Sequence, residues 1–106
     1  MSNMKDRQEG FERKFAMDEE TRFKATARRN KLLGLWAAEK LGKSGDEADA
    51  YAKDVVRADF EEAGDDDVFR KVFGDLQAGG AKEGETDVRR AMEELMLVAA
   101  EQVRNG

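Results

Sequence analysis

The sequence contains no cysteine and no histidine. Disulfides are therefore excluded, and so are the common nucleophile–base pairs and the soft-ligand metal sites that depend on these two residues. Asp and Glu number 24, but none of these carboxylates stands out as an acid or base of a catalytic pair. We therefore predict a protein that is not an enzyme, with no catalytic residue, no metal and no cofactor.

Long hydrophobic runs are also missing. No stretch approaches the roughly 20 apolar residues of a membrane span, and the N-terminus has no apolar run of the kind found in signal peptides. We expect a cytoplasmic protein with no direct membrane insertion. The net charge of −5 argues against nucleic-acid binding, which usually depends on basic patches.

Good helix formers dominate the 106 residues, and β-branched residues are few. This composition predicts an all-α fold, in which residues 18–106 form a four-helix bundle. Apolar residues recur at helical spacing in four segments, and none of the segments can bury its apolar face alone. The expected helices cover about 18–41, 44–62, 65–78 and 86–105.

Glycine and capping residues predict the ends of these helices. Gly42 is expected to end the first helix, and Ser44 with Glu47 has the spacing of a capping box. Thr86 is a good N-cap for the last helix. Gly34, inside the first helix, predicts close approach by a neighbouring helix, and Trp36 is predicted to lie in the core.

The apolar positions of the last three helices are expected to face the core. In the second helix they include Tyr51, Val55 and Phe60. The full set is Ala48, Tyr51, Ala52, Val55, Val56 and Phe60, then Val68, Phe69, Val72, Phe73 and Leu76, then Val88, Ala91, Met92, Leu95, Met96, Ala99 and Val103.

Two charged clusters each allow two interpretations. The acidic run 61–67 could hold a cation, but it lacks the ligand spacing of a calcium loop, so we favour a helix end followed by an acidic cap. The basic residues of the first helix are either a solvated face, with pairs such as Glu20–Lys24, or a docking patch for an acidic partner. The possible docking residues are Arg22, Arg28 and Arg29.

Residues 1–17 differ in character from the rest of the chain. Phe11 and Phe15 are four residues apart and would share one face of a helix, yet their neighbours are nearly all charged. Both rings could fold back onto the bundle. We favour a flexible arm that becomes ordered on binding a partner, because the segment offers no further core positions.

Two stretches carry a resemblance to a known family. They are FERKFAMDEETRFKATARRNKLLGLWAAEKLG at 11–42 and YAKDVVRADFEEAGDDDVFRKV at 51–72. The chain resembles the zeta subunit of the alphaproteobacterial F-type ATP synthase, a family of ATPase inhibitors, over nearly its whole length. The resemblance implies a four-helix bundle with a mobile N-terminal arm.

The resemblance also implies a mode of action. The arm becomes helical and inserts at the catalytic interface of the alpha and beta subunits near gamma, which blocks rotation in the direction of ATP hydrolysis. In this sequence the inhibitory segment would be about Ser2–Thr21. From the chemistry of its residues we expect Phe11 and Phe15 to be apolar anchors and Glu9, Arg13 and Lys14 to be polar contacts. The free protein is expected to be a monomer, and the bound one to lie at the cytoplasmic face of the inner membrane. The alternative is a helical adaptor that binds another partner through the basic face of its first helix.

Overall fold

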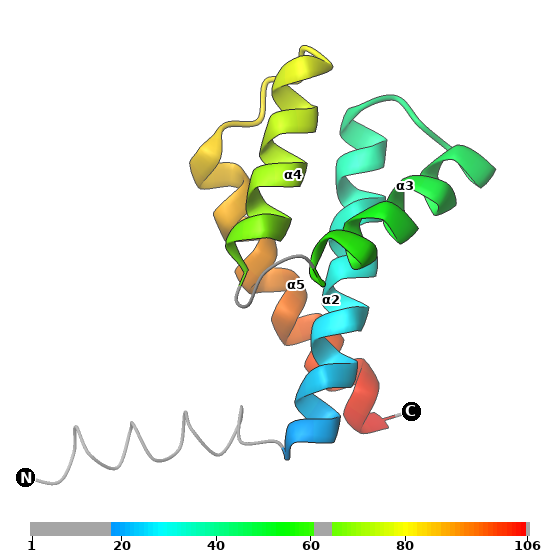
Figure 1. The fold of residues 1–106 in the computed structure, drawn as a ribbon, viewed down its shortest axis with the longest axis vertical. Coiled ribbons are helices and arrows are strands. Elements are labelled where there is room, and N and C mark those ends of the chain that lie inside the picture. Colours follow the sequence, from blue (N-terminus) through cyan, green and yellow to red (C-terminus); the bar gives the residue numbers. More distant parts are fainter. Residues whose placement is uncertain (1–17, 61–64, 106) are drawn as a thin grey trace, which may run out of the picture.

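The computed structural model describes residues 18–60 and 65–105, which form an all-α bundle of four helices with no strand in those ranges (Figure 1). The helices are α2 (Glu19–Lys40), α3 (Gly45–Ala58), α4 (Asp66–Ala78) and α5 (Glu85–Asn105). The predicted fold class is confirmed. The predictions for residues 1–17 lie outside the described residues. Within those residues, no helix combines the length and apolar character that a membrane crossing requires.

Helix α2 has well-formed ends. Its N-cap is Asp18, whose Oδ1 accepts a hydrogen bond of 2.7 Å from the backbone N–H of Thr21. This bond lowers the pKa of the Asp18 carboxyl, because it stabilises the charged form. At the other end Gly42 has a φ of 77°, and the Lys43 N–H donates to the Ala38 carbonyl at 2.8 Å. The predicted glycine stop at Gly42 is confirmed.

Helix α3 differs from the prediction at both ends. Ser44 is the N-cap but makes no side-chain cap hydrogen bond, so the predicted capping box with Glu47 is wrong. Gly45 enters the helix with a φ of 57°, and a first helical residue in that conformation does not present the following amides to the cap. The helix ends at Ala58, and Phe60 beyond it is 70% exposed rather than part of the core.

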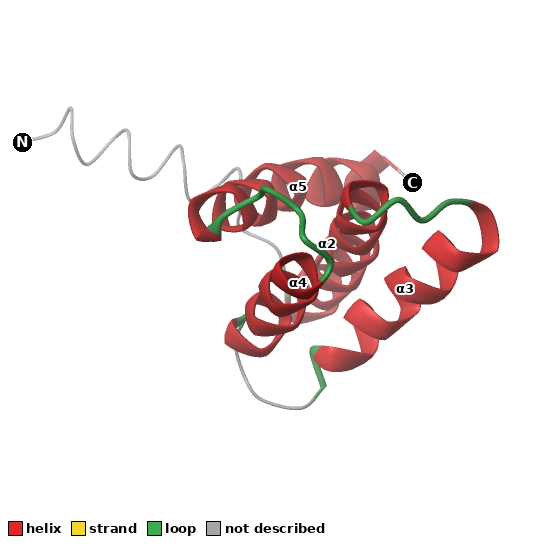
Figure 2. Cartoon of the chain, turned by 90° about the horizontal axis from the view of Figure 1, so that it is seen from above, coloured by secondary structure: helices red, strands yellow, loops and turns green. Residues whose placement is uncertain are grey.

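Helix α2 is the centre of the molecule and packs mainly against α3 and α5, which lie on different sides of it (Figure 2). The crossing with α3 is close at Gly34. A Cβ added at Gly34 would lie 2.5 Å from the Ala52 Cα. The predicted close approach at this glycine is therefore confirmed, and only glycine lets the two backbones meet this way.

The core lies between the C-terminal half of α2 and the other three helices. Its buried members include Leu33, Val55, Leu76 and Val88. Trp36 is only half-buried at the edge of this core, and the Lys40 Nζ lies 5.8 Å from its ring centroid. The prediction of a core tryptophan is therefore wrong in degree, because one side of the indole faces the solvent-exposed rim between α2 and α5.

Helix α5 begins one residue before the predicted cap. Thr86 lies inside the helix, and the Asp87 carboxylate accepts a hydrogen bond of 2.9 Å from the Gly84 N–H. Thr86 is therefore not the N-cap, and Asp87, inside the first turn, bonds back to the backbone of Gly84 before the helix. Later in the helix Leu97 and Val98 are 43% and 42% exposed, so the apolar surface of α5 extends beyond its core-facing side.

Candidate partner-binding surface

The basic residues of α2 do not form one surface. Arg22 and Arg28 are exposed, as a docking patch requires, whereas Arg29 is only 2% exposed. Its position explains this: Ala25, Arg29 and Leu33 are four residues apart, so they lie on one stripe of the helix, and that stripe faces inward. The burial contradicts the prediction that Arg29 contributes to an exposed docking patch.

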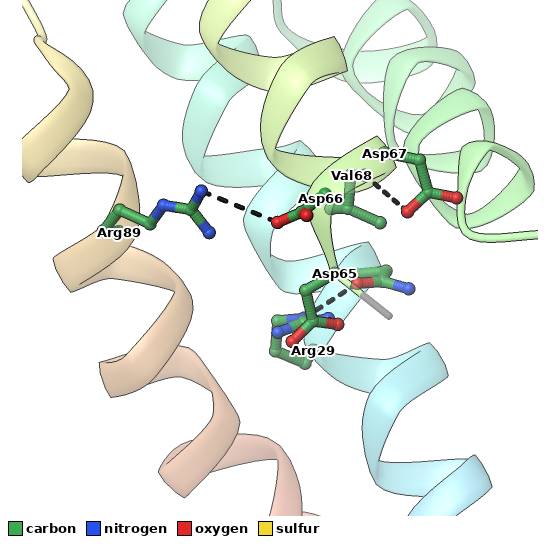
Figure 3. A network of polar contacts seen from close by, with 7 residues as sticks. Arg29, Asp65, Asp66, Asp67, Val68 and Arg89 are labelled. Carbon is green, nitrogen blue, oxygen red and sulfur yellow. Dashed lines mark hydrogen bonds and ion pairs between the residues drawn. The ribbon is translucent and has the colours of Figure 1, made fainter. Parts of the chain in front are cut away.

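Arg29 instead joins α2 to the start of α4. Its Nη2 lies 2.8 Å from Asp65 Oδ1, and its Nε donates to Asn30 Oδ1 at 2.8 Å (Figure 3). A buried guanidinium needs such partners, because an unpaired charge inside a protein is strongly destabilising. Arg29 is therefore a structural residue.

The acidic run supplies a carboxylate partner of Arg29 at this junction between α2 and the start of α4. Asp65 is the N-cap of α4, but its side chain makes no cap hydrogen bond. Its carboxylate accepts a hydrogen bond from Arg29 instead. Asp66 Oδ1 lies 3.7 Å from Arg89 Nη2 of α5 (Figure 3). Asp67 Oδ1 accepts a hydrogen bond of 2.8 Å from the Val68 N–H. Asp65 thus occupies the predicted cap position and Asp66 and Asp67 the first turn, but the side-chain cap hydrogen bond is not made, and the sequence did not indicate the pairing with other helices.

Asp59, at the end of α3, borders the same junction. Partial burial, and then the neighbouring Asp67 carboxylate, raise the pKa of Asp59 above its ordinary value. Carboxylates from α3 and α4 therefore crowd around one buried arginine of α2. This arrangement holds the three helices together.

One exposed surface among the described residues is a groove that begins along the N-terminal half of α2 and continues along α3. It consists of two adjoining hollows, of about 550 and 870 Å³, that share Lys31 and Val56. The first lies against α3 and includes Phe60, and the second lies against α5 and includes Phe23. Sequence reasoning missed this groove, because Val56 and Phe60 were assigned to the core.

Two polar contacts involve basic residues that line this groove. Lys24 pairs with Glu20 at 3.3 Å, which confirms the predicted pair, and both side chains are well exposed. Arg28 Nη1 donates to Gln102 Oε1 of α5 at 3.0 Å. The Arg28 contact ties the lower parts of α2 and α5 together, where Figure 1 shows them side by side away from α3 and α4.

The predicted arm residues Glu9, Phe11, Arg13, Lys14 and Phe15 lie outside the described residues. The structure does show where the arm joins the bundle. Asp18 caps α2 at the end of the molecule that is farthest from the loop between α4 and α5 (Figure 1). Asp18, to which residues 1–17 are joined in sequence, therefore lies at the groove-bearing half of α2.

Comparison with known proteins decides the family. The model of the family described as ATPase inhibitor subunit zeta matches residues 1–102. The chain belongs to this family. A solved structure, determined by solution NMR, is 61% identical to this zeta family member with a TM-score of 0.70, and the similarity covers 78% of this chain and 94% of the other. No curated protein gave a significant match.

The family match has a consequence for the division of the chain. The matched range includes residues 1–17 as well as the bundle, so the family model covers both parts of the chain.

Proposed function

We propose that this zeta family member inhibits ATP hydrolysis by the F-type ATP synthase. Residues 1–17 insert at the catalytic interface between the alpha and beta subunits near gamma, become helical there, and block rotation in the direction of hydrolysis. The observation that supports this proposal most is the family match, which names an ATPase inhibitor and extends to residue 1. The protein thus acts at the cytoplasmic face of the inner membrane, as a monomer before it binds.

The chemistry of the arm fits insertion into a protein interface. Phe11 and Phe15 are spaced to share one helix face, and burial of each ring contributes roughly 1.5–3 kcal/mol. Ordering the arm costs about 2–5 kcal/mol. Because these terms nearly cancel, charge pairing by Glu9, Arg13 and Lys14 sets the net affinity.

The bundle supports the arm mechanically. Helix α2 is packed between α3 and α5, and its N-cap at Asp18 is formed by a local hydrogen bond within α2. An arm that becomes helical upstream of Asp18 is thereby attached to a body anchored by Arg29 and by the Gly34 crossing. A force on the arm is passed to the whole bundle.

Substitution of Phe15 tests the proposal. Phe15→Ala should weaken inhibition of ATP hydrolysis by the purified cognate enzyme by about tenfold or more, because the loss of roughly 1.4 kcal/mol corresponds to a factor of ten. Phe15→Leu keeps an apolar side chain and should retain most of the inhibition. Equal potency of the wild-type protein and Phe15→Ala would exclude Phe15 as an anchor.

A further inference from the structure

The groove along α2 has a border of strongly one-sided charge. Six basic side chains line its two hollows, in a chain whose net charge is −5, and Asp49 is the single carboxylate among the lining residues. The basic residues are Lys24, Arg28, Lys31, Lys53, Arg57 and Arg104. A positive surface of this kind on an acidic protein favours a negatively charged partner.

The floor of the groove is apolar and open. Phe23 and Phe60 are 64% and 70% exposed, which makes them the most exposed large apolar side chains among the described residues. Ala27, Val56 and Val103 also line the two hollows and are half-buried. Exposed aromatic groups with an apolar floor and a charged rim are typical of protein-binding surfaces.

The shape of the groove indicates the form of the partner. Phe23, Ala27 and Lys31 follow one another at four-residue intervals along α2 and line the second hollow, which is bordered by Val56 of α3 and by Val103 of α5. The first hollow extends this surface along α3 through Lys53 and Phe60. An elongated apolar trough between helices is the surface into which an amphipathic helix lays its apolar face. Basic residues along both hollows would then meet acidic residues on the flanks of that helix.

We propose that this groove docks an acidic amphipathic helix on the catalytic head of the ATP synthase, as a second contact besides the arm. The inference rests on the proposed function. The two contacts are continuous, because the arm meets the bundle at Asp18 and the groove begins at Thr21 and Phe23. Linking two weak contacts in one chain raises the overall affinity without requiring either one to be strong.

Charge reversal at Lys31, which is shared by both hollows, tests the inference. Lys31→Glu should weaken binding of the full chain to the purified head by about five- to tenfold, and this difference should shrink at high salt. Lys82→Glu, in the exposed loop between α4 and α5 far from the groove, makes the same charge change and should bind like the wild-type protein. Phe60→Ala, at a side chain outside the core, should also weaken binding.

Each outcome separates this inference from the proposed function. If wild-type protein does not bind the head at all, the proposed function fails and the groove inference fails with it. If wild-type protein binds and inhibits while Lys31→Glu and Phe60→Ala bind equally well, only the groove inference is overturned. A loss of self-association in these variants, with unchanged affinity for the head, would assign the groove to a second copy and also overturn it.

A photo-crosslink identifies the chemistry of the partner. The chain has no native cysteine, so Lys53→Cys at the groove wall can be labelled at one site with benzophenone maleimide. In the complex with the head, the captured peptide should carry net negative charge and apolar residues at helical spacing. Capture of a basic or non-helical peptide would contradict the proposed occupant.

Discussion

At position 29 an arginine occupies a site where helix spacing would place an apolar side chain. Its guanidinium is almost fully buried, whereas its partner Asp65 is 51% exposed. The cost of burying the charge is met by one ion pair and one hydrogen bond, both at 2.8 Å. Arg29 therefore depends on Asp65, and removal of the carboxylate leaves the cation buried with less compensation.

Neighbouring aspartates allow this dependence to be measured. We expect Asp65→Asn to lower the free energy of unfolding by about 1–2 kcal/mol, less than for a fully buried pair because Asp65 is partly hydrated. Asp66→Asn removes the same charge from the same helix start, but its pair with Arg89 is long and exposed, so the loss should stay below about 1 kcal/mol. Urea unfolding would compare the two, and equal losses would contradict the structural role of the Arg29–Asp65 pair.

Tyr51 allows a second test at the scale of single residues, because the stability that its hydroxyl contributes should depend on pH. Its hydroxyl donates to Asp75 Oδ2 at 2.8 Å and joins α3 to α4. Burial, and then this carboxylate, raise the pKa of Tyr51 in the folded state above the ordinary value near 10. The folded state thus holds the proton more tightly than the unfolded chain, so the stabilisation is present below pH 10 and declines as pH rises above it.

Tyr51→Phe should therefore lose roughly 0.5–1.5 kcal/mol at pH 8. The difference from the wild-type protein should narrow above about pH 10, since only the wild-type protein has the phenol to titrate. Chemical denaturation of both proteins at several pH values measures this. A difference that widened with rising pH would show that the sign of the linkage is wrong.

At the scale of helices, replacing glycine by alanine should have opposite effects on stability at two helical positions. Gly34 lies where α2 meets the Ala52 backbone of α3, while a Cβ on Gly74 of α4 would meet nothing within 4 Å. Gly34→Ala should destabilise the protein, because roughly 1–3 kcal/mol of overpacking outweighs the gain of about 1 kcal/mol in helix propensity. Gly74→Ala should gain up to about 1 kcal/mol. Thermal unfolding of the two variants would show the contrast, and a stabilising Gly34→Ala would contradict the close crossing.

The same scale shows what sequence could predict. Four helices, the glycine stop at Gly42 and the close approach at Gly34 followed from local chemistry, since helix propensity and glycine C-caps act over a few residues. The exposure of Phe60 did not follow, because the helical spacing of α3 continues past its actual end at Ala58. An apolar residue in register with a helix is not buried if the helix stops before reaching it.

The candidate site could be predicted only in part, because it depends on contacts between residues that are far apart in the sequence. The burial of Arg29 depends on Asp65, which is 36 residues away in the sequence, and no local sequence pattern indicates that contact. The spacing of Ala25, Arg29 and Leu33 did carry a signal, since it places the arginine on the core stripe. The groove depends on three helices at once, so its residues could be grouped only after the helices were packed.

At the scale of the whole molecule, the account assigns different tasks to two parts of the chain. The bundle of residues 18–105 has its own core and a closed N-cap at Asp18. A deletion that preserves this cap must therefore stop at residue 17. Removal of residues 2–17 should leave helicity per residue and melting temperature of the bundle nearly unchanged, because helices α2 to α5 supply a continuous buried core of their own.

The most direct measurement is ATP hydrolysis by the purified cognate ATP synthase, titrated with the full chain and with the chain lacking residues 2–17. The account predicts that the full chain inhibits hydrolysis and that the shortened chain, still folded by circular dichroism, does not. Full inhibition by the shortened chain, or none by the full chain, would contradict the claim that the N-terminal segment is the inhibitor and the bundle its support.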